Sequence, residues 1–315
     1  MPVRFPIGGF FELERSSGVK RDFPLNAVNS GRSGLELILR HYRPSKLWIP
    51  FFICNCVPEF LTSIGQLYDR YHVDAQLEMV HPIDLRSGEM LLYVNYFGIK
   101  DSYCDILQKQ YGHSLILDLT QAFFYQNKAK CPSFSSLRKF FGVPDGGFVT
   151  GVPQGDIDVL PMANGAEHAA HLIYRADGKQ AEAYQFFLDN SRHFEHDHPL
   201  QMSRLAYHIM CGVSIKGVQE ARQRNYCHLY QAFNKINRLA PLESKIAPLS
   251  YPFLVEDGDA IRKELIASSI FIPKYWPGLE ELNDDEQNAV DNIIHLPIDQ
   301  RYGIKEMDII LERLL

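Results

Sequence analysis

Short apolar segments that alternate with helical patterns constrain the fold of this chain more than any other feature of its sequence. Residues 46–50, 90–98 and 113–118 read as buried strands, and a helical pattern over residues 102–111 separates the second strand from the third. Strands that are joined through helices pair in parallel, with helices on both faces of the sheet. We therefore predict an α/β fold with three layers, in which helices cover a mostly parallel sheet.

Two polar side chains lie near the ends of strands in this predicted sheet. Asn95 lies near the end of the second strand segment, and Asp118 ends the third. Ligands of open α/β sheets gather at the carboxyl ends of the strands. We therefore expect both side chains to lie where a ligand would bind.

A turn rich in serine and glycine opens the first helical pattern. Residues 30–34 read Ser-Gly-Arg-Ser-Gly and lead into a helical pattern at residues 35–40. The first turn of a helix has free backbone N–H groups beside the positive end of the helix dipole, which is a suitable site for a phosphate. The same residues also fit an ordinary helix cap at Ser30 or Ser33.

One lysine next to a glycine-rich turn is a candidate for covalent chemistry. Lys139 precedes Phe140 and Phe141, and residues 144–147 read Pro-Asp-Gly-Gly. An apolar environment lowers the pKa of a lysine amine, and such an amine can form a Schiff base with a carbonyl, most often that of pyridoxal 5'-phosphate (PLP). The alternative is that Arg138 and Lys139 form a solvated basic pair.

The middle of the chain predicts two more strands and two long helices. Strands are expected near residues 147–151 and 156–159, followed by a polar helix over residues 165–188. The longest helical pattern runs over residues 214–239, where we expect a helix that connects two domains.

A break after this connector helix divides the chain. Proline at position 241 ends the helical pattern, so we predict a large domain over residues 1–240 and a small α+β domain over residues 241–315. The small domain is expected to contain strands at 250–255 and 270–273 and helices at 259–268, 279–290 and 304–315.

Charge and composition argue against a nucleic-acid partner and against a membrane. The chain has 32 basic and 38 acidic residues, a net charge of −6, and 46% hydrophobic residues. No apolar run approaches the roughly 18 residues that span a bilayer, and the N-terminal residues lack the apolar core of a secretory signal. We expect a cytoplasmic protein that binds neither nucleic acid nor membranes, with its six cysteines reduced and mostly buried.

Three groups of residues resemble metal sites but lack a full set of ligands. Cys54 and Cys56 lack a second pair of thiols, and the histidine cluster at residues 193–198 reads as an exposed loop. His168 and His171 form an HxxH pattern without the glutamate of a zinc protease, so we expect a surface helix there. We expect no metal.

The phosphate-type turn, the strand-end acid and the lysine occur in the order that is typical of fold type I PLP enzymes. In detail they resemble the DegT/StrS family of aminotransferases, which act mostly on nucleotide-linked keto sugars. Residues 118–122 (DLTQA) are similar to the D-x-x-Q-A element of that family, and Lys139 precedes Asp145-Gly146-Gly147 as the Schiff-base lysine precedes the family's E-G-G. Further resemblance lies in residues 30–35 (the S-G-T-x-A-L turn), 94–98 (the V-H-L-Y-G strand) and 49–52 (the P-x-Y/F segment).

This resemblance implies a role for each matching residue. Lys139 would form the Schiff base with PLP and then move a proton, and Asp118 would pair with the pyridinium nitrogen. Gln121 would form a hydrogen bond near the ring hydroxyl. The phosphate would be held by Gly31, Arg32 and Ser33.

The chain also departs from the family pattern. Cys54 stands where members usually carry the aromatic residue that stacks on the ring, which leaves Phe52 as a candidate, and Asn95 replaces a common histidine. Phe134 stands where a phosphate-binding serine belongs. That contact would pass to Ser133, Ser135 or Ser136.

The resemblance implies a PLP-dependent aminotransferase that moves an amino group from an amino acid, with glutamate as the expected donor, to the keto group of a nucleotide-linked sugar in polysaccharide biosynthesis. It also implies a homodimer with active sites at the subunit interface. The main alternative is a PLP-binding or regulatory protein of the same fold with little turnover. Lys139 argues against the related sugar dehydratases, in which histidine replaces the lysine, and no GxGxxG follows a predicted strand to support a dinucleotide-binding enzyme.

Overall fold

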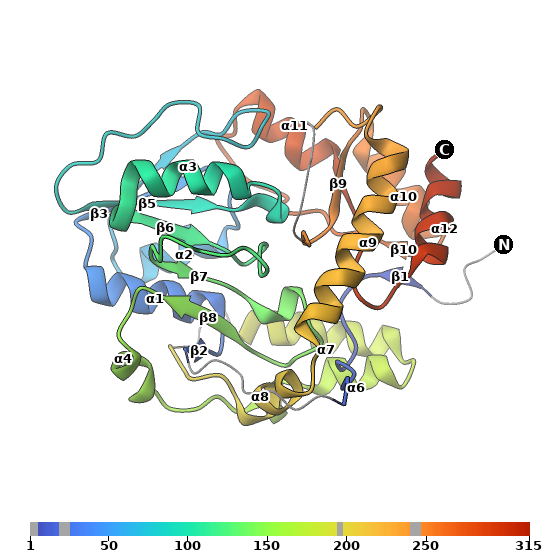
Figure 1. Ribbon diagram of the computed structural model, residues 1–315, viewed down its shortest axis with the longest axis horizontal. Coiled ribbons are helices and arrows are strands. Elements are labelled where there is room, and N and C mark those ends of the chain that lie inside the picture. The colour runs from blue at the N-terminus through green and yellow to red at the C-terminus, as the bar shows by residue number, and fades with distance from the viewer. Residues whose placement is uncertain (1–5, 19–25, 194–197, 240–246) are drawn as a thin grey trace.

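A mostly parallel sheet forms the centre of the molecule (Figure 1). The computed structural model describes residues 6–18, 26–193, 198–239 and 247–315. The strands of the sheet are β2 (Ala27–Val28), β3 (Lys46–Pro50), β4 (Tyr68–Tyr71), β5 (Glu89–Val94), β6 (Leu115–Asp118), β7 (Ser133–Phe134) and β8 (Gly147–Thr150). They lie in the order β2-β8-β7-β6-β5-β3-β4, with every pair from β7 to β4 parallel and with β8 antiparallel to both of its neighbours. The predicted α/β class is confirmed.

Helices pack against this sheet between its strands. Helix α1 packs against β7 and β8, and α3 packs against β6. The bounds of the helices up to the connector are α1 (Gly31–Tyr42), α2 (Cys56–Ser63), α3 (Asp101–Tyr111), α4 (Gln154–Asp158), α5 (Gly165–His168), α6 (Ala170–Ala176), α7 (Gln180–His193), α8 (Arg204–Cys211) and α9 (Ile215–Phe233). None of the helices in the described residues is long and apolar enough to cross a bilayer.

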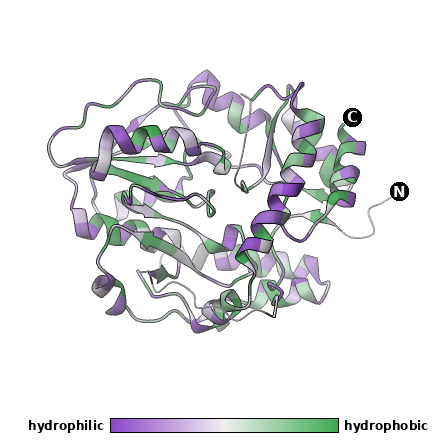
Figure 2. Cartoon of the chain, viewed as in Figure 1, coloured by the Kyte–Doolittle hydropathy of each residue, from purple (hydrophilic) through white to green (hydrophobic). Residues whose placement is uncertain are grey.

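The central strands β5 and β6 are completely buried, so the residues at their carboxyl ends are held rigidly. Every residue of β5 and β6 is buried, as expected for strands that are covered on both faces. Figure 2 shows hydrophobic residues along these strands and many hydrophilic residues on α9. Asp118 is the only acid in β6, so its carboxylate is carried into a mainly apolar environment.

The region between β8 and the connector helix differs from its prediction. Residues 156–159 were expected to form a strand, but most of them belong to α4, which begins directly after Pro153. Proline fixes φ near the helical value, and the structure places Pro153 at the N-cap of this short helix. The polar pattern over residues 165–188 forms α5, α6 and α7, because Gly178, with a φ of +79°, turns the chain between α6 and α7.

The connector helix α9 ends earlier than predicted. It stops at Phe233, and the turn after it contains Asn237. The Asn237 side chain donates to Pro252 O at 3.0 Å and accepts from the N–H group of Leu254 at 3.1 Å. Asn237 Oδ1 also accepts from the N–H group of Leu239 at 3.0 Å, and such a local bond from a side chain to the backbone competes with helix formation.

The C-terminal part of the chain builds two further small sheets. Its elements are β9 (Tyr251–Leu254), α10 (Gly258–Ala267), β10 (Ile270–Phe271), α11 (Asp284–Asn292), β11 (Ile293–Leu296) and α12 (Ile304–Leu314). Strands β9 and β11 pair antiparallel, whereas β10 pairs in parallel with β1 (Ile7–Gly8) from the N-terminal segment (Figure 1). Val290 and Ile293 pack in the same hydrophobic cluster as the central sheet. Packing therefore crosses residue 240, and a domain boundary there stays a prediction.

A buried histidine on β11 makes the stability of the fold depend on pH. His295 is 3% exposed, and burial lowers its pKa to about 3, below the ordinary value of 6.5. The folded chain therefore keeps this imidazole neutral, while the unfolded chain takes up a proton as the pH falls below 6.5. We expect His295 to contribute about 2 kcal/mol to the loss of unfolding free energy between pH 7.5 and pH 5.0.

Urea unfolding at both pH values tests this expectation. His295→Gln should reduce the difference in unfolding free energy between the two pH values by about 2 kcal/mol. The exposed His113 provides the matched control, and His113→Gln should leave the difference unchanged. An equal pH dependence in wild type and His295→Gln would contradict the burial argument.

Candidate active site

The structure brings the strand-end acid and the lysine together around Thr120. The Lys139 amine donates a hydrogen bond to Thr120 Oγ1 at 3.2 Å. The backbone N–H group of Thr120 donates to Asp118 Oδ1 at 2.8 Å. Lys139 ends the short 3-10 turn η3 (Leu137–Lys139), and Asp118 ends β6, so the two groups meet at the carboxyl end of the sheet.

Asp118 has the environment of a functional carboxylate. It is 5% exposed, and its burial raises its pKa, while the positive charge of Lys139 and the hydrogen bond from Thr120 act in the opposite direction. Perturbed acids next to a specific charge partner are frequent at active sites. Asp118 can therefore exchange or share a proton with a group that enters this space.

The N-terminus of α1 borders the same space. A Cβ atom on Gly31 would lie 3.0 Å from Thr120 Cγ2 and 3.3 Å from Ser135 O, so a larger residue would have little room there. Ser30 caps the helix, because its Oγ accepts from the N–H group of Ser33 at 3.1 Å. The first N–H groups of α1 thus lie next to Thr120, in a position suited to an anion.

The serines that were candidates for phosphate binding differ in what they contact. Ser33 Oγ donates to Asn29 Oδ1 at 2.5 Å, and Ser135 Oγ accepts from the Phe148 N–H group at 3.1 Å. Ser133 is 3% exposed and lies 2.7 Å from the Thr150 hydroxyl. The hydroxyl of Ser136, at the start of η3, makes no hydrogen bond within the described part of the chain.

Gln121 has a buried donor that the described part of the chain does not use. Its Oε1 accepts from the N–H group of Phe97 at 2.9 Å, which fixes the side chain. Its Nε2 is buried and has no hydrogen-bond partner among the described residues. A buried donor of this kind costs free energy unless a ligand or water accepts from it.

Asn95 and Phe52, two further candidates for cofactor binding, contact other residues of the protein instead. Asn95 Nδ2 donates to Asp101 Oδ1 at 2.7 Å, and Asn95 Oδ1 accepts from the N–H group of Lys100 at 3.0 Å. The Phe52 ring is 1% exposed and stacks on Tyr96, with a centroid separation of 5.4 Å. The face of the Phe52 ring is therefore covered by the chain's own aromatic residues.

The Cys54 thiol lies near enough to Lys139 and Asp118 to sense both of their charges. A hydrogen bond from Cys56 lowers the pKa of the Cys54 thiol, and the positive charge of Lys139 acts in the same direction. Only Cys104 and Cys131 of the six cysteines are buried, whereas Cys54, Cys56, Cys211 and Cys227 are partly exposed, so the expectation that the cysteines are mostly buried is wrong.

Arg138 and Lys139 are both only partly exposed, and burial lowers the pKa of the Arg138 guanidinium to about 10. The alternative of a solvated basic pair is therefore not supported, and a second expectation is corrected nearby. His168 and His171 are 6% and 4% exposed, and the prediction that they lie on a surface helix is wrong. His171 packs against Phe10, with ring centroids 6.2 Å apart.

No metal site accompanies these residues in the part of the chain that the structure describes. No three histidines, cysteines or acids gather there in an arrangement that could hold an ion. Most of the histidine cluster at residues 193–198 lies outside the described residues.

Sequence reasoning gave no role to three residues that the structure places around Lys139. Thr120 lies inside the DLTQA element, and its contact with Lys139 could have been suspected from that position. Glu14 and Gln300 contact the turn that follows Lys139. Both lie more than 100 positions away in the sequence, and no motif surrounds either of them.

Comparison with known proteins identifies the fold. Neither a protein-family model nor a curated protein matches the sequence. Among solved structures, the aminotransferase TlmJ from Streptoalloteichus hindustanus is 12% identical, with 98% of this chain and 97% of that chain covered and a TM-score of 0.65. This chain has the fold of the sugar aminotransferases.

Two further solved structures agree with this result. The putative sugar aminotransferase Spr1654 from Streptococcus pneumoniae, in its PMP form, is 15% identical, with 99% and 96% of the two chains covered and a TM-score of 0.61. A DegT DnrJ EryC1 StrS aminotransferase from Brucella abortus is 16% identical, with 91% and 84% covered and a TM-score of 0.58. The match of this aminotransferase fold over nearly the whole chain confirms the fold predicted from the resemblance.

Proposed function

We propose that this protein is a PLP-dependent aminotransferase that uses Lys139. The observation that carries the proposal is the hydrogen bond of the Lys139 amine to Thr120, whose own N–H group bonds to the buried carboxylate of Asp118. A lysine and an acid fixed on one small residue, beside a helix N-terminus, are groups suited to a phosphorylated ring with an aldehyde. The aminotransferase fold supports the same conclusion.

The residues of the site fit PLP. Gly31 and Arg32 would hold its phosphate through their backbone N–H groups, and the hydroxyl of Ser136 would add a donor. The buried Gln121 Nε2 would donate to the ring hydroxyl, which would satisfy an atom that now lacks a partner. Ser33 and Ser135 would support this cradle through their contacts on α1 and β8.

When bound, PLP supplies an aldehyde that takes up an amino group and a ring that withdraws electrons from the neighbouring carbon. Lys139 would bond to the aldehyde carbon and, once released, move a proton between substrate and cofactor. Asp118 would hold a proton on the ring nitrogen, because an ionised carboxylate stabilises a positive charge beside it.

For the substrates, we propose chemical classes rather than individual compounds. We propose an amino acid, with glutamate as the first candidate, as the amino donor, and the keto group of a nucleotide-linked sugar as the acceptor. The structural neighbours include a putative sugar aminotransferase, which supports a sugar acceptor. We further propose a cytoplasmic homodimer with its active sites at the subunit interface, which acts in polysaccharide biosynthesis.

Spectroscopy of the purified protein with added PLP tests this function. We expect the bound cofactor to colour the protein yellow, and L-glutamate to remove the colour while one equivalent of 2-oxoglutarate per site appears. Succinate, which has no amine, should change nothing. A protein that binds no PLP would refute the proposal.

The same experiment separates the second candidate, a PLP-binding or regulatory protein with little turnover. Cys54 favours this candidate, because a thiol lies where an aromatic ring would be expected to stack on the cofactor, and the Phe52 ring is covered. Colour that persists with glutamate and with other amino acids would support it.

A further inference from the structure

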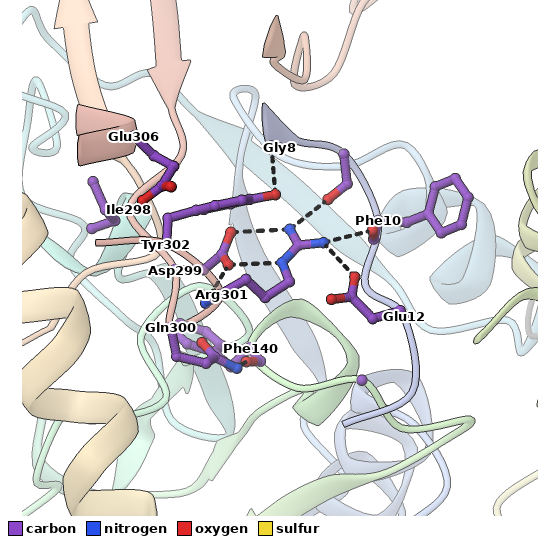
Figure 3. Close-up of polar contacts among 12 residues, drawn as sticks. Gly8, Phe10, Glu12, Phe140, Ile298, Asp299, Gln300, Arg301, Tyr302 and Glu306 are labelled. Carbon is purple, nitrogen blue, oxygen red and sulfur yellow. Dashed lines mark hydrogen bonds and ion pairs between the residues drawn. The ribbon is translucent and has the colours of Figure 1, made fainter. Parts of the chain in front are cut away.

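The turn after Lys139 is held by side chains from distant parts of the chain. The carbonyl oxygen of Phe140 accepts a hydrogen bond from Gln300 Nε2 at 2.7 Å (Figure 3). It also lies 3.5 Å from Arg222 Nη2, and the Arg222 guanidinium covers the Phe140 ring at 4.7 Å. Gln300 lies 160 residues from Phe140, in the loop between β11 and α12.

A glutamate completes the support of this turn. Glu14 Oε2 accepts from the Gly142 N–H group at 2.9 Å and from Gln300 Nε2 at 3.1 Å. The N–H group of Glu14 in turn donates to Gly142 O at 2.9 Å. Gln300 therefore bridges the carboxylate that holds Gly142 and the carbonyl group of Phe140.

Gln300 is itself fixed in place. Its Oε1 accepts from Arg222 Nε at 3.2 Å, and Arg222 Nη1 donates to Leu249 O at 3.1 Å. On either side of Gln300, Asp299 and Arg301 form an ion pair at 2.8 Å, and Arg301 also donates to the carbonyl oxygen of Phe10 at 3.0 Å (Figure 3). The loop that carries Gln300 is thus tied to the N-terminal segment.

The chain before Lys139 is held by backbone hydrogen bonds rather than by distant side chains, among them the bond from the Ser135 N–H group to Phe148 O at 2.9 Å. The N–H group of Leu137, at the start of η3, donates to Gly146 O at 2.9 Å. This contact lies within the same lysine-bearing segment. The position of Lys139 therefore depends on backbone contacts before it and on the side chains of Gln300, Glu14 and Arg222 after it.

We propose that Gln300 is a positioning residue for Lys139. By donating to the carbonyl group of Phe140 it holds the turn so that the Lys139 amine stays at Thr120 and Asp118. The proposal rests on the proposed function, because it concerns the reaction of this amine with PLP. It assigns to the C-terminal part of the chain a direct influence on the reactive lysine.

Two variants of Gln300 separate positioning from folding. Gln300→Glu keeps the shape of the side chain but replaces both donated hydrogen bonds with repulsion of two oxygens, and Gln300→Met fills the same space without a donor. We expect each variant to weaken the binding of PLP about tenfold, because a displaced amine reacts less readily with the aldehyde. Binding of pyridoxamine phosphate, which has the same ring and phosphate but cannot bond to a lysine, should change less than about twofold.

The measurements are titrations of both compounds and, after reduction with borohydride, mass spectrometry of the peptide that contains Lys139. Gln287→Glu is the matched control, because Gln287 is exposed on α11 and also donates to a carboxylate, that of Asp291. This control should bind both compounds as the wild type does. A folded Gln300→Met protein, shown by its unfolding midpoint, keeps the test valid where Gln300→Glu fails to fold.

The outcomes are distinct. Loss of PLP binding with retention of pyridoxamine phosphate binding supports the proposal. Equal losses for both compounds would show a merely structural role, and no loss would show that the hydrogen bond has no influence on Lys139, so either result overturns the proposal while the proposed function stands. Wild-type protein that binds neither compound refutes the proposed function and this proposal together.

Discussion

Lys139→Ala is expected to reduce the rate of amino transfer at least about a thousandfold, because it removes both the covalent attachment and the group that moves the proton. The variant should also lose the yellow colour with PLP and should show no borohydride-stable adduct on the peptide around position 139. In the described part of the chain the Lys139 amine makes one hydrogen bond, to Thr120, so its loss should cost about 1 kcal/mol of unfolding free energy and leave the protein folded. The rate of 2-oxoglutarate formation from glutamate is the measurement.

Lys128→Ala is the control for this prediction. Lys128 is exposed and lies in the loop after β6, so its removal should leave colour, adduct and rate unchanged. A Lys139→Ala protein with the absorption spectrum and rate of the wild type would remove Lys139 from the mechanism. A mass adduct on another lysine would move the reactive amine there.

Elements whose neighbours in space are also neighbours in sequence were predictable. The buried pattern of β5 and β6 and the capped start of α1 follow from contiguous residues, and the structure confirms them. The strand predicted over residues 90–98 is shorter, however, because it ends at Val94 and residues 96–98 form a 3-10 helix. The order of the helix-opening turn, Asp118 and Lys139 pointed to one pocket, and the structure places these groups around Thr120.

Contacts between distant segments were not predictable. His171 belongs to the polar pattern over residues 165–188, and its ring is buried by packing against Phe187 from α7 and Phe10 from the N-terminal segment. Gln300 has the composition of a surface loop on both sides, yet its amide reaches the turn after Lys139. A single sequence gives no signal for such pairs, because periodicity reports a buried face but not its partner.

The position of Phe52 likewise depends on a contact with a distant segment. Its place after Pro50 suggested a ring that faces the cofactor, since the segment resembles a family element. In the structure Phe52 instead packs with Tyr96 and, edge to face at 4.8 Å, with Trp276 from the C-terminal part. The aromatic partner that decides the orientation of Phe52 therefore comes from a segment that the local pattern could not include.

Gly142→Ala is expected to destabilise the protein by about 3 kcal/mol or more, because the structure leaves no room for a side chain there. A Cβ atom at this position would lie 1.9 Å from the carbonyl oxygen of Glu12 and 2.7 Å from the backbone nitrogen of Glu14. Both neighbours are backbone atoms, so a rotamer change cannot relieve the overlap. The N-terminal segment would have to move away and break the two hydrogen bonds between Glu14 and Gly142.

Urea unfolding measures the unfolding free energy of Gly142→Ala, with Gly155→Ala as the control. A Cβ atom on Gly155, which lies in α4, would meet nothing within 4 Å, and alanine favours a helix over glycine by up to about 1 kcal/mol. The control should therefore be as stable as the wild type or slightly more stable. Equal unfolding free energies for the two variants would mean that the N-terminal segment does not pack on the turn after Lys139, and the support that Glu14 gives to that turn would then have to be abandoned.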